Sequence, residues 1–301
     1  MEGNLKLRYI LKKIYYTLRR PKKLDFPEVI SIELSTICNA KCKFCPHASI
    51  VKNNMRQSIM PAEIFKKIIN DCIGYKNLKE IKPNLYGDPA VTPYLFDRLA
   101  YIRKKLPNVA IKIVTNGSEL SKEKSDKLIK ENLCDKINFS LDASNKETFE
   151  KFKGISWDKT LANIHYFIDK NNKHGRKIHV ILSYVHTPEN KGQFAEFKRM
   201  WKGKVSEFHI GSEVGVNRRT DFFKKNTNLP CLEPFRRLSI LTDGTAVFCC
   251  VDAYAEGIVG NVKNNSISEI WNSEAFEKIR KLHLSKQKKN IPFCSKCSEW
   301  L

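Results

Sequence analysis

The chain has 301 residues, and its 54 Lys and Arg against 32 Asp and Glu give a formal net charge of +22. Because 42% of its residues are hydrophobic, it can fill a sizeable core, which excludes a disordered or low-complexity protein. No apolar run approaches the ~20 residues of a membrane-spanning helix, and the N-terminus lacks the pattern of a secretory signal. Ten cysteines in such a chain indicate metal or redox chemistry in the cytoplasm rather than structural disulfides.

The positive charge is spread along the whole chain. It would attract anions, including phosphorylated small molecules, but it fits a solvated lysine-rich surface equally well, so it predicts no specific nucleic-acid partner. Residues 4–20 are the exception, because Leu7, Ile14 and Leu18 recur at helical spacing among basic residues. We expect this basic amphipathic helix, within residues 1–25, to pack on the following domain rather than to contact a membrane surface.

Past this segment, short apolar runs alternate with amphipathic helical patterns. The pattern predicts six strands, at 29–35, 80–86, 109–115, 135–141, 177–185 and 205–210. It predicts five helices between them, at 61–75, 94–105, 121–132, 160–173 and 192–201. Such alternation is typical of βα units around a parallel sheet. Since no dinucleotide-binding fingerprint follows the first strand, we predict an α/β fold with a partial (β/α)6 TIM-like barrel over residues 26–212.

The pattern changes after about residue 211. A polar stretch precedes a predicted hairpin of residues 238–241 and 245–249, and one helix is predicted at 267–284. We therefore expect residues 213–301 to form a small C-terminal α+β domain, which ends with a Cys-x-x-Cys pair.

Three cysteines follow the first predicted strand in the segment CNAKCKFC: Cys38, Cys42 and Cys45. Three thiolates can hold three irons of a cubane cluster, which leaves the fourth iron open for a substrate or cofactor. A zinc site or incidental thiols are the alternatives, although zinc sites usually combine two close cysteine pairs. Because active sites form at the C-terminal ends of barrel strands, this position favours a functional metal site.

This cysteine spacing, with the aromatic Phe44 before the third cysteine, resembles the signature of the radical S-adenosylmethionine (SAM) superfamily. The resemblance implies a [4Fe–4S] cluster whose open iron chelates SAM. It also implies an enzyme that cleaves SAM reductively, with an electron from a flavodoxin- or ferredoxin-type donor, into methionine and a 5′-deoxyadenosyl radical. That radical abstracts a hydrogen atom from the substrate.

Polar residues at the following strand ends resemble the family as well. The segment Tyr86-Gly87-Asp88-Pro89 is similar to the family's Gly-Gly-Glu-Pro, which meets the SAM amino group, and departs from it at Tyr86 and Asp88. A shorter carboxylate can still accept a hydrogen bond from an ammonium group. The contacts with SAM that the resemblance implies come from Phe44, Gly87, Asp88, Asn116, Ser140, Asp142 and Asn190.

Five further cysteines lie in the C-terminal part: Cys231, Cys249, Cys250, Cys294 and Cys297. Four thiolates suit zinc or an iron–sulfur cluster, and their spacing alone does not decide. The run CLEPFRRLSILTDGTAVFCC and the closing CSKC resemble the auxiliary-cluster region of the SPASM/twitch branch of radical SAM enzymes. The chain resembles the shorter twitch type, such as the aminocyclitol dehydrogenase of butirosin biosynthesis, and this implies one auxiliary [4Fe–4S] cluster.

The resemblance implies four ligands for this auxiliary cluster: Cys231, Cys249, Cys294 and Cys297. Cys249 is preferred to Cys250 because it completes the family's Gly-x-x-x-x-Cys spacing, and because neighbours on a strand point to opposite faces. Cys72 and Cys134 fall outside both clusters, and we expect them to be ordinary buried thiols.

Three functions are weighed. The first is a radical SAM oxidoreductase that oxidises a small hydroxylated substrate, similar to a sugar or an aminocyclitol, by two electrons. The second is a peptide-maturing enzyme of the same branch, although the roughly 25 residues before the first strand are too few for a separate leader-recognition domain. The third is a zinc-stabilised, basic nucleic-acid-binding protein, which leaves the three cysteines after the first strand unexplained.

The sequence assigns no catalytic acid or base. Several polar residues could face a substrate as readily as they could serve the fold: His47, Arg56, His186, His209, Glu213 and Arg218.

Overall fold

The computed structural model describes residues 21–43, 45–47, 50, 59–212, 230–295 and 297. Five features expected from the sequence lie outside these residues: the helix at 4–20, Phe44, Arg56, Glu213 and Arg218. No helix in the described part of the chain is long and apolar enough to cross a membrane.

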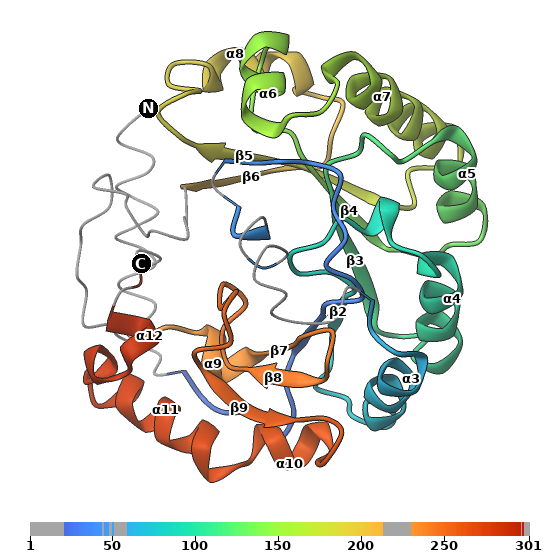
Figure 1. Ribbon diagram of the computed structural model, residues 1–301. Helices are drawn as coiled ribbons and strands as arrows, with labels where there is room; N and C mark the ends of the chain where they lie inside the picture. Colours follow the sequence, from blue (N-terminus) through green and yellow to red (C-terminus); the bar gives the residue numbers. More distant parts are fainter. Residues whose placement is uncertain are drawn as a thin grey trace.

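Six parallel strands form the curved sheet that dominates the molecule (Figure 1). They are β1 (Val29–Ile32), β2 (Glu80–Lys82), β3 (Ala110–Thr115), β4 (Lys136–Ser140), β5 (His179–His186) and β6 (Glu207–Ser212). Each strand pairs in parallel with the next one along the chain. The predicted partial (β/α)6 barrel is therefore confirmed, with β1 and β2 shorter than the sequence pattern indicated.

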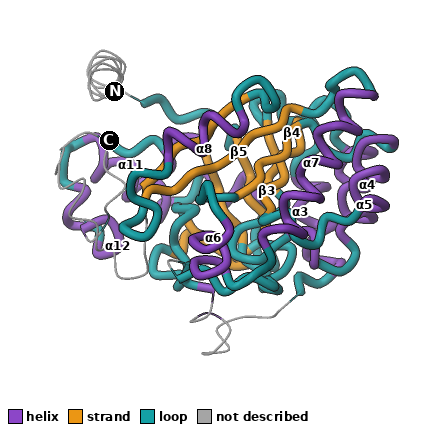
Figure 2. The backbone as a smooth tube through the Cα atoms, turned by 90° about the horizontal axis from the view of Figure 1, so that it is seen from above, coloured by secondary structure: helices purple, strands orange, loops and turns teal. Residues whose placement is uncertain are grey.

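Helices surround this sheet on its outer side (Figure 1), and Figure 2 shows α3, α4, α5 and α7 beside β3 and β4. The helices are α3 (Ala62–Asp71), α4 (Leu95–Lys105), α5 (Lys122–Lys130), α7 (Trp157–Lys173) and α8 (Phe194–Trp201). The short 3-10 helix η1 (Pro89–Val91) follows β2. Ser121 caps α5 as expected, because its hydroxyl accepts from the Lys124 N–H.

One helix of the barrel, α6 (Lys146–Lys153), was not predicted. Asn145 caps its start by accepting from the Thr148 N–H at 2.9 Å. Gly154 ends it with a φ of 67°, a left-handed conformation that glycine adopts at little cost. Asn145 and Gly154 are the sequence signals from which α6 could have been predicted.

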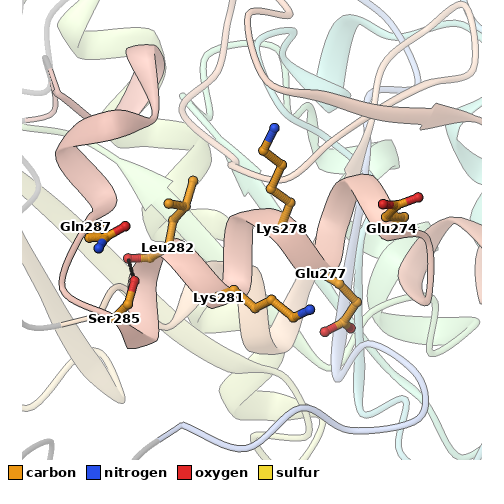
Figure 3. Close-up of a pocket in the computed structure, with 7 residues that line it drawn as sticks. All are labelled: Glu274, Glu277, Lys278, Lys281, Leu282, Ser285 and Gln287. Atoms are coloured by element: carbon orange, nitrogen blue, oxygen red, sulfur yellow. Dashed lines mark hydrogen bonds between the residues drawn. The ribbon is translucent and has the colours of Figure 1, made fainter.

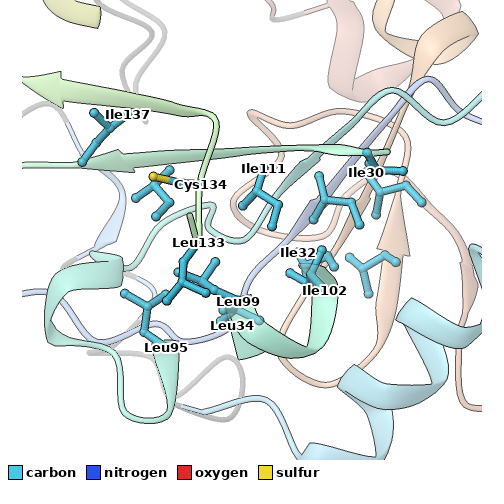
Figure 4. Packing of buried hydrophobic residues seen from close by; sticks show 14 of the residues in the cluster. Ile30, Ile32, Leu34, Leu95, Leu99, Ile102, Ile111, Leu133, Cys134 and Ile137 are labelled. Carbon is cyan, nitrogen blue, oxygen red and sulfur yellow. The ribbon is translucent and has the colours of Figure 1, made fainter. Parts of the chain in front are cut away.

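The outward-facing residues of the strands form the main hydrophobic core together with the helices. In β3 burial alternates along the strand, so that Ile111 and Ile113 are buried while their neighbours are less so. Figure 4 shows Ile111 near Leu99 and Ile102 of α4. Burying each such side chain contributes roughly 1.5–3 kcal/mol. The expected burial of Cys72 and Cys134 is confirmed, since they are 1% and 0% exposed.

The C-terminal part extends the same sheet instead of standing apart from it. Its strands are β7 (Arg237–Ile240), β8 (Thr245–Val247) and β9 (Ile258–Asn261). β7 and β8 form the predicted antiparallel hairpin, and Gly244 turns with a φ of 90°. β7 also pairs in parallel with β1, which the sequence did not indicate. The sheet is therefore continuous across the proposed boundary at residue 213, and that division stays a prediction.

Helices complete this part: α9 (Glu233–Arg236), α10 (Ile267–Trp271), α11 (Glu274–Leu284), η3 (Lys288–Asn290) and α12 (Pro292–Ser295). The prediction of one helix over 267–284 was wrong, because Asn272 ends α10 and Ser273 begins α11. The Ser273 hydroxyl accepts from the Phe276 N–H at 3.3 Å, so it acts as a new N-cap.

Candidate functional site

The loop after β1 carries three cysteines, called here the first cysteine loop: Cys38, Cys42 and Cys45. The end of α6 holds this loop through two backbone hydrogen bonds. The Lys41 N–H donates to the Lys153 carbonyl at 2.8 Å, and the Lys43 N–H donates to the Phe152 carbonyl at 3.3 Å. The cysteines therefore lie at the C-terminal edge of the parallel strands, where the sequence pattern placed them.

Burial raises the pKa of each of these thiols, to about 12 for Cys38 and about 11 for Cys45. The nearby Asp88 carboxylate raises the pKa of Cys38 further, whereas the Lys153 ammonium lowers the pKa of Cys42. Thiols of this kind stay protonated at neutral pH until a metal displaces the proton. Three half-buried thiols on one loop thus fit a cationic iron–sulfur cluster.

The segment after β2 packs against the start of the first cysteine loop. The Asp88 N–H donates to the Ile37 carbonyl at 2.8 Å. A Cβ on Gly87 would lie 2.1 Å from the Ser35 carbonyl oxygen and 2.9 Å from the Ile37 carbonyl oxygen. Only glycine allows the two backbones to approach this closely.

The Asp88 carboxylate is buried and accepts hydrogen bonds from within the protein. Its Oδ1 accepts from the Ala90 N–H and the Thr115 hydroxyl, both at 2.8 Å, and its Oδ2 accepts from the Asn116 N–H at 2.6 Å. Burial raises the pKa of Asp88, and these donors lower it. Both oxygens thus join the segment after β2 to the end of β3, a role that competes with the predicted contact to SAM.

Asn116 connects the end of β3 to the first cysteine loop. Its Nδ2 donates to Asn39 Oδ1 at 3.0 Å, and Asn39 Nδ2 donates to the Ser118 hydroxyl at 2.8 Å. Asn116 Oδ1 in turn accepts from the Ser118 N–H at 2.9 Å. Nothing in the sequence marked Asn39, apart from its position directly after Cys38.

Asp142 forms a buried ion pair with Lys153, with 2.7 Å between Oδ2 and Nζ and side-chain exposures of 0% and 2%. Its Oδ1 accepts from the Val185 N–H at 2.8 Å, and its Oδ2 accepts from the Ser140 hydroxyl at 3.2 Å. The Asn190 side chain donates to the Asp142 carbonyl at 2.8 Å. The polar residues expected after β4 and β5 are therefore joined in one network.

Lys153 is a site residue that the sequence did not reveal, because it belongs to the unpredicted α6. Its carbonyl supports Lys41 of the first cysteine loop, and its ammonium group lies within electrostatic range of Cys42 and Cys45. The network at the strand ends thus reaches the cysteines through both Asn39 and Lys153.

The three described histidine candidates have different surroundings. His47 Nε2 lies 2.5 Å from the Thr36 carbonyl, so His47 fastens the loop on which it lies. His186 is exposed and packs edge-on against Tyr184, with 5.0 Å between ring centroids. His209 lies on β6, and its pKa is lowered by burial and then by two lysines of the sheet, which are described below.

Three cysteines of the C-terminal part lie close together and are called here the second cysteine group: Cys231, Cys294 and Cys297. Two of them, Cys231 and Cys294, contact His283 of α11. The Cys231 N–H donates to His283 Nδ1 at 3.2 Å, and His283 Nε2 lies 3.7 Å from Cys294 Sγ. Because Nδ1 accepts, the neutral ring carries its proton on Nε2, directed at the sulfur. His283 is 1% exposed, and burial lowers its pKa to about 4.

A buried lysine, Lys288 of η3, lies within electrostatic range of the same three thiols. Burial lowers the pKa of Lys288 to about 8, and the three cysteines oppose this change. Burial also raises the pKa of Cys231 to about 12, with smaller increases from Glu233, Cys297 and Cys294. The group therefore combines three thiols, one neutral imidazole and one buried ammonium.

Cys249 and Cys250 lie in a turn, because β8 ends at Val247. The expectation that they point to opposite faces of a strand was therefore wrong. Their thiols hydrogen-bond to each other, which is the main cause of the raised pKa of Cys249 and of the lowered pKa of Cys250. Cys231 also raises the pKa of Cys249, so Cys249 is the thiol beside the second cysteine group.

Cys250 has different neighbours. Its Sγ lies 3.7 Å from Glu233 Oε2, and Arg237 and Lys82 lower its pKa. Its carbonyl accepts from the Tyr86 hydroxyl at 3.3 Å. Because Tyr86 directly precedes Gly87, this bond links the segment beside the first cysteine loop to the turn that carries Cys249 and Cys250. This link is a structural reason for tyrosine at a position where the family pattern has glycine.

Among the described side chains, no three Cys, His, Asp or Glu converge closely enough to bind one metal ion. Four thiolates on a single zinc ion would each lie ~2.3 Å from the same centre. A cubane cluster instead distributes its ligands over separate irons.

A separate pocket lies along α11, and its lining residues are shown in Figure 3. Its lining consists of Glu274, Glu277, Lys278, Lys281, Leu282, Ser285 and Gln287. Acidic and basic side chains balance one another along this helix, and the lining contains no cysteine. We therefore assign the chemistry to the strand ends and not to this pocket.

Comparison with protein families decides what the cysteine sets belong to. Residues 32–200, more than half of the chain, match the family described as the radical SAM superfamily. The chain belongs to the radical SAM superfamily. Residues 231–298 match SPASM, described as an iron–sulfur cluster-binding domain. This radical SAM enzyme is therefore expected to use SAM, a [4Fe–4S] cluster and auxiliary iron–sulfur chemistry, which overturns the interpretation as a zinc-stabilised nucleic-acid-binding protein.

The radical SAM chain is similar to several curated proteins. It is 30% identical to GTP 3′,8-cyclase of Paenarthrobacter nicotinovorans over 134 residues, which are 44% of this chain and only 37% of the cyclase. It is 24% identical to the tungsten-containing aldehyde ferredoxin oxidoreductase cofactor-modifying protein of Pyrococcus furiosus, over 89% of this chain and 86% of that protein. It is 21% identical to the SAM-dependent 2-deoxy-scyllo-inosamine dehydrogenase of Niallia circulans, over 90% of this chain and 92% of the dehydrogenase.

Solved structures share its fold. BtrN in complex with AdoMet and 2-DOIA matches with a TM-score of 0.59 at 17% identity, over 90% of this chain and 92% of BtrN. SuiB of Streptococcus suis, bound to the precursor peptide SuiA, matches with a TM-score of 0.68 at 16% identity, over 91% of this chain and 70% of SuiB. The native anSMEcpe with bound AdoMet matches with a TM-score of 0.64 at 15% identity, over 85% of this chain and 83% of anSMEcpe.

Proposed function

We propose that this radical SAM enzyme is an oxidoreductase that removes two electrons from a small hydroxylated substrate, similar to a sugar or an aminocyclitol. The observation that carries the proposal is the Tyr86–Cys250 hydrogen bond, which links the segment beside the first cysteine loop to the turn of Cys249 and Cys250 along one continuous sheet. The similarity to a 2-deoxy-scyllo-inosamine dehydrogenase over 90% of the chain supports this substrate class.

The proposed ligands of the SAM-binding cluster are Cys38, Cys42 and Cys45, and those of the auxiliary cluster are Cys231, Cys249, Cys294 and Cys297. When bound, the first cluster and SAM supply a 5′-deoxyadenosyl radical, and the auxiliary cluster supplies an acceptor for one electron. The substrate carbon loses a hydrogen atom, and then one electron and the hydroxyl proton leave, so that an alcohol becomes a carbonyl. This accounts for two electrons overall.

Side chains of the protein itself hold the first cysteine loop in place beside the strand ends. The Asn39–Asn116 and Asp142–Lys153 pairs fix the first cysteine loop against the ends of β3 and β4. The backbone at Gly87 lies directly beside this loop, which supports its proposed contact with SAM. The further SAM contacts proposed from the sequence are Phe44, Asp88, Asn116, Ser140, Asp142 and Asn190.

A peptide-maturing enzyme is the second candidate. It is favoured by the fold of SuiB, which was solved with a precursor peptide and has a higher TM-score than BtrN. Assays with a peptide library and with a panel of aminocyclitols and sugars separate the candidates, because only the true substrate class should yield a product in step with 5′-deoxyadenosine.

The test uses anaerobically reconstituted protein with a strong reductant, SAM and this panel. We expect 5′-deoxyadenosine together with a product lighter by two hydrogens. The variant Cys294→Ala/Cys297→Ala should keep SAM cleavage and lose product formation, whereas Cys134→Ala, which removes a buried thiol outside both sets, should keep both. A soluble double variant that makes product at the normal rate would refute the electron-acceptor role.

A further inference from the structure

Three cations lie together on the inner face of the curved sheet, called here the cationic cluster: Lys82 of β2, Lys112 of β3 and Arg237 of β7. Strand neighbours point to opposite faces. The residues next to these cations, Ile81, Ile111 and Leu238, are 0% exposed in the outer core, so the cations face inward. Ile81 pairs with Ile111, which places the two lysines side by side on adjacent strands.

Carboxylates compensate the two lysines only in part, because Glu80 raises the pKa of both and Glu207 raises that of Lys112, yet the pKa of each lysine is lowered. In the described part of the chain, no carboxylate lies within 4 Å of the Lys112 ammonium. The carboxylate nearest to Lys82 is Glu80 at 3.8 Å, and Glu80 also binds Lys136 at 2.7 Å. Arg237 is better satisfied, because it pairs with Glu233 at 2.5 Å.

The electrostatics of these groups show mutual repulsion. Burial, followed by Arg237 and Lys112, lowers the pKa of Lys82 to about 8. Burial also lowers the pKa of Lys112, and both lysines lower the pKa of His209. Folded proteins rarely hold partly buried lysines without a counter-charge, because desolvation and like-charge repulsion both oppose it. A bound anion would remove this repulsion.

The position of the cationic cluster separates it from the expected SAM contacts. Lys112 lies three residues before Thr115 at the end of β3, or about 10 Å along the strand. At its other side the cluster approaches the C-terminal part, since Cys250 raises the pKa values of both Lys82 and Arg237. The cluster therefore lies on the inner face between the strand ends and the turn that carries Cys249.

We propose that the cationic cluster binds an oxyanion of the substrate, either a phosphate ester or a carboxylate. An arginine and two lysines suit such a group, because Arg offers paired donors and Lys offers a compact charge. Binding there orients the hydroxylated part of the substrate between the two cysteine sets. The inference rests on the proposed function and specifies the substrate class of that same site.

The test measures binding of two probes, inorganic phosphate and succinate, to the anaerobically reconstituted full-length protein by calorimetry, with and without saturating SAM. We expect the wild type to bind one probe, and Lys112→Met and Lys82→Met to weaken binding by at least about tenfold, as for loss of a charge-assisted hydrogen bond. Lys112→Arg should retain binding. The control Lys104→Met, an exposed lysine on α4, should match the wild type.

Stronger binding of phosphate assigns a phosphate ester, and stronger binding of succinate assigns a carboxylate. The inference is overturned if neither probe binds the wild type, if the Met variants bind as well as the wild type, or if SAM displaces the probe. SAM cleavage is measured on the same wild-type preparation, so that failure of the inference can be distinguished from failure of the proposed function. Cleavage without anion binding refutes only the inference, and anion binding without cleavage refutes the proposed function.

Discussion

The two cysteine sets are built in contrasting ways. The first occupies one loop at the edge of the sheet, where all three thiols are partly exposed and hydrogen bonds from two strand ends and α6 hold the loop. The second collects thiols from distant segments around His283 and Lys288, which are 1% and 3% exposed. The thiols themselves differ little in exposure, since only Cys294 is buried and the others are partly exposed. Three thiolates leave one iron of a cubane open to a ligand, whereas four fill every corner iron, and this difference in ligand number matches the proposed division of roles.

The largest expected effect is on the first cysteine loop. Replacing Cys38, Cys42 and Cys45 by Ala should abolish formation of 5′-deoxyadenosine, because no thiolates remain to hold the cluster that binds SAM. Iron analysis should show loss of about four irons, those of one cubane. The second set should keep its iron, since it shares no ligand with this loop. Persistent SAM cleavage would contradict the assignment of the first loop.

A single methyl group added at Gly87 should disturb the first cysteine loop almost as strongly as the loss of its cysteines. In Gly87→Ala the new Cβ would meet the Ser35 carbonyl oxygen at 2.1 Å, so the segment after β2 must move away from the first cysteine loop. We expect most first-cluster iron to be lost and the free energy of unfolding to fall by about 1–3 kcal/mol. Gly211→Ala is the control, because a Cβ added there would have nothing within 4 Å. Equal iron contents in the two variants would refute the steric argument.

The third prediction concerns the surroundings of the second cysteine group. In His283→Leu the N–H directed at Cys294 Sγ is lost, and this donor stabilises the more negative, reduced cluster. The auxiliary potential should fall by on the order of 50 mV, about a tenfold change in the one-electron equilibrium. An EPR-monitored redox titration measures this value.

Two further variants make that titration specific. His283→Gln retains a donor and should recover part of the potential. His165→Leu removes a ring that stacks on Trp201 of α8, so it should leave the auxiliary potential unchanged. If the Leu and Gln variants at position 283 had the same potential as the wild type, the hydrogen bond would have no electronic role.

The smallest expected effect lies between the two regions, at Lys82. Its folded pKa of about 8 is below the ~10.4 of an unfolded lysine, so the unfolded chain binds more protons between these values. The free energy of unfolding of the wild type should therefore rise with pH from about 8 to 10.4. Below pH 8 the buried ammonium of Lys82 is fully charged and destabilises the fold to its full extent. The free energy of unfolding of Lys82→Met should exceed that of the wild type by about 1–2 kcal/mol at pH 7.

Denaturant titrations at pH 7 and pH 9.5 measure this difference, with Lys104→Met as the control. The advantage of Lys82→Met should shrink at the higher pH, because the wild-type ammonium is then losing its proton. An advantage of equal size at both pH values would show that the charge of Lys82 is not its cause.

Local patterns in the sequence determined much of this protein. Alternating apolar runs located all six barrel strands to within a few residues, because strand and helix periodicities depend on which side of the chain is buried. The three closely spaced cysteines indicated the first site for a similar reason, since ligands within one short loop need no tertiary structure to come together. The hairpin of β7 and β8 was equally local, as its turn depends on Gly244.

Only the tertiary structure decided which distant residues meet. It placed β7 beside β1, directed His283 at Cys294, and brought Lys153 of the unpredicted α6 to the first cysteine loop. It also lined up the lysines of β2 and β3 on one inner face. Except for His283 and Cys294, which are 11 residues apart, these contacts join segments tens to hundreds of residues apart. Each residue by itself resembles an ordinary surface or core residue. Their roles arise from the pairing of strands and the closing of the sheet, which local periodicity does not encode.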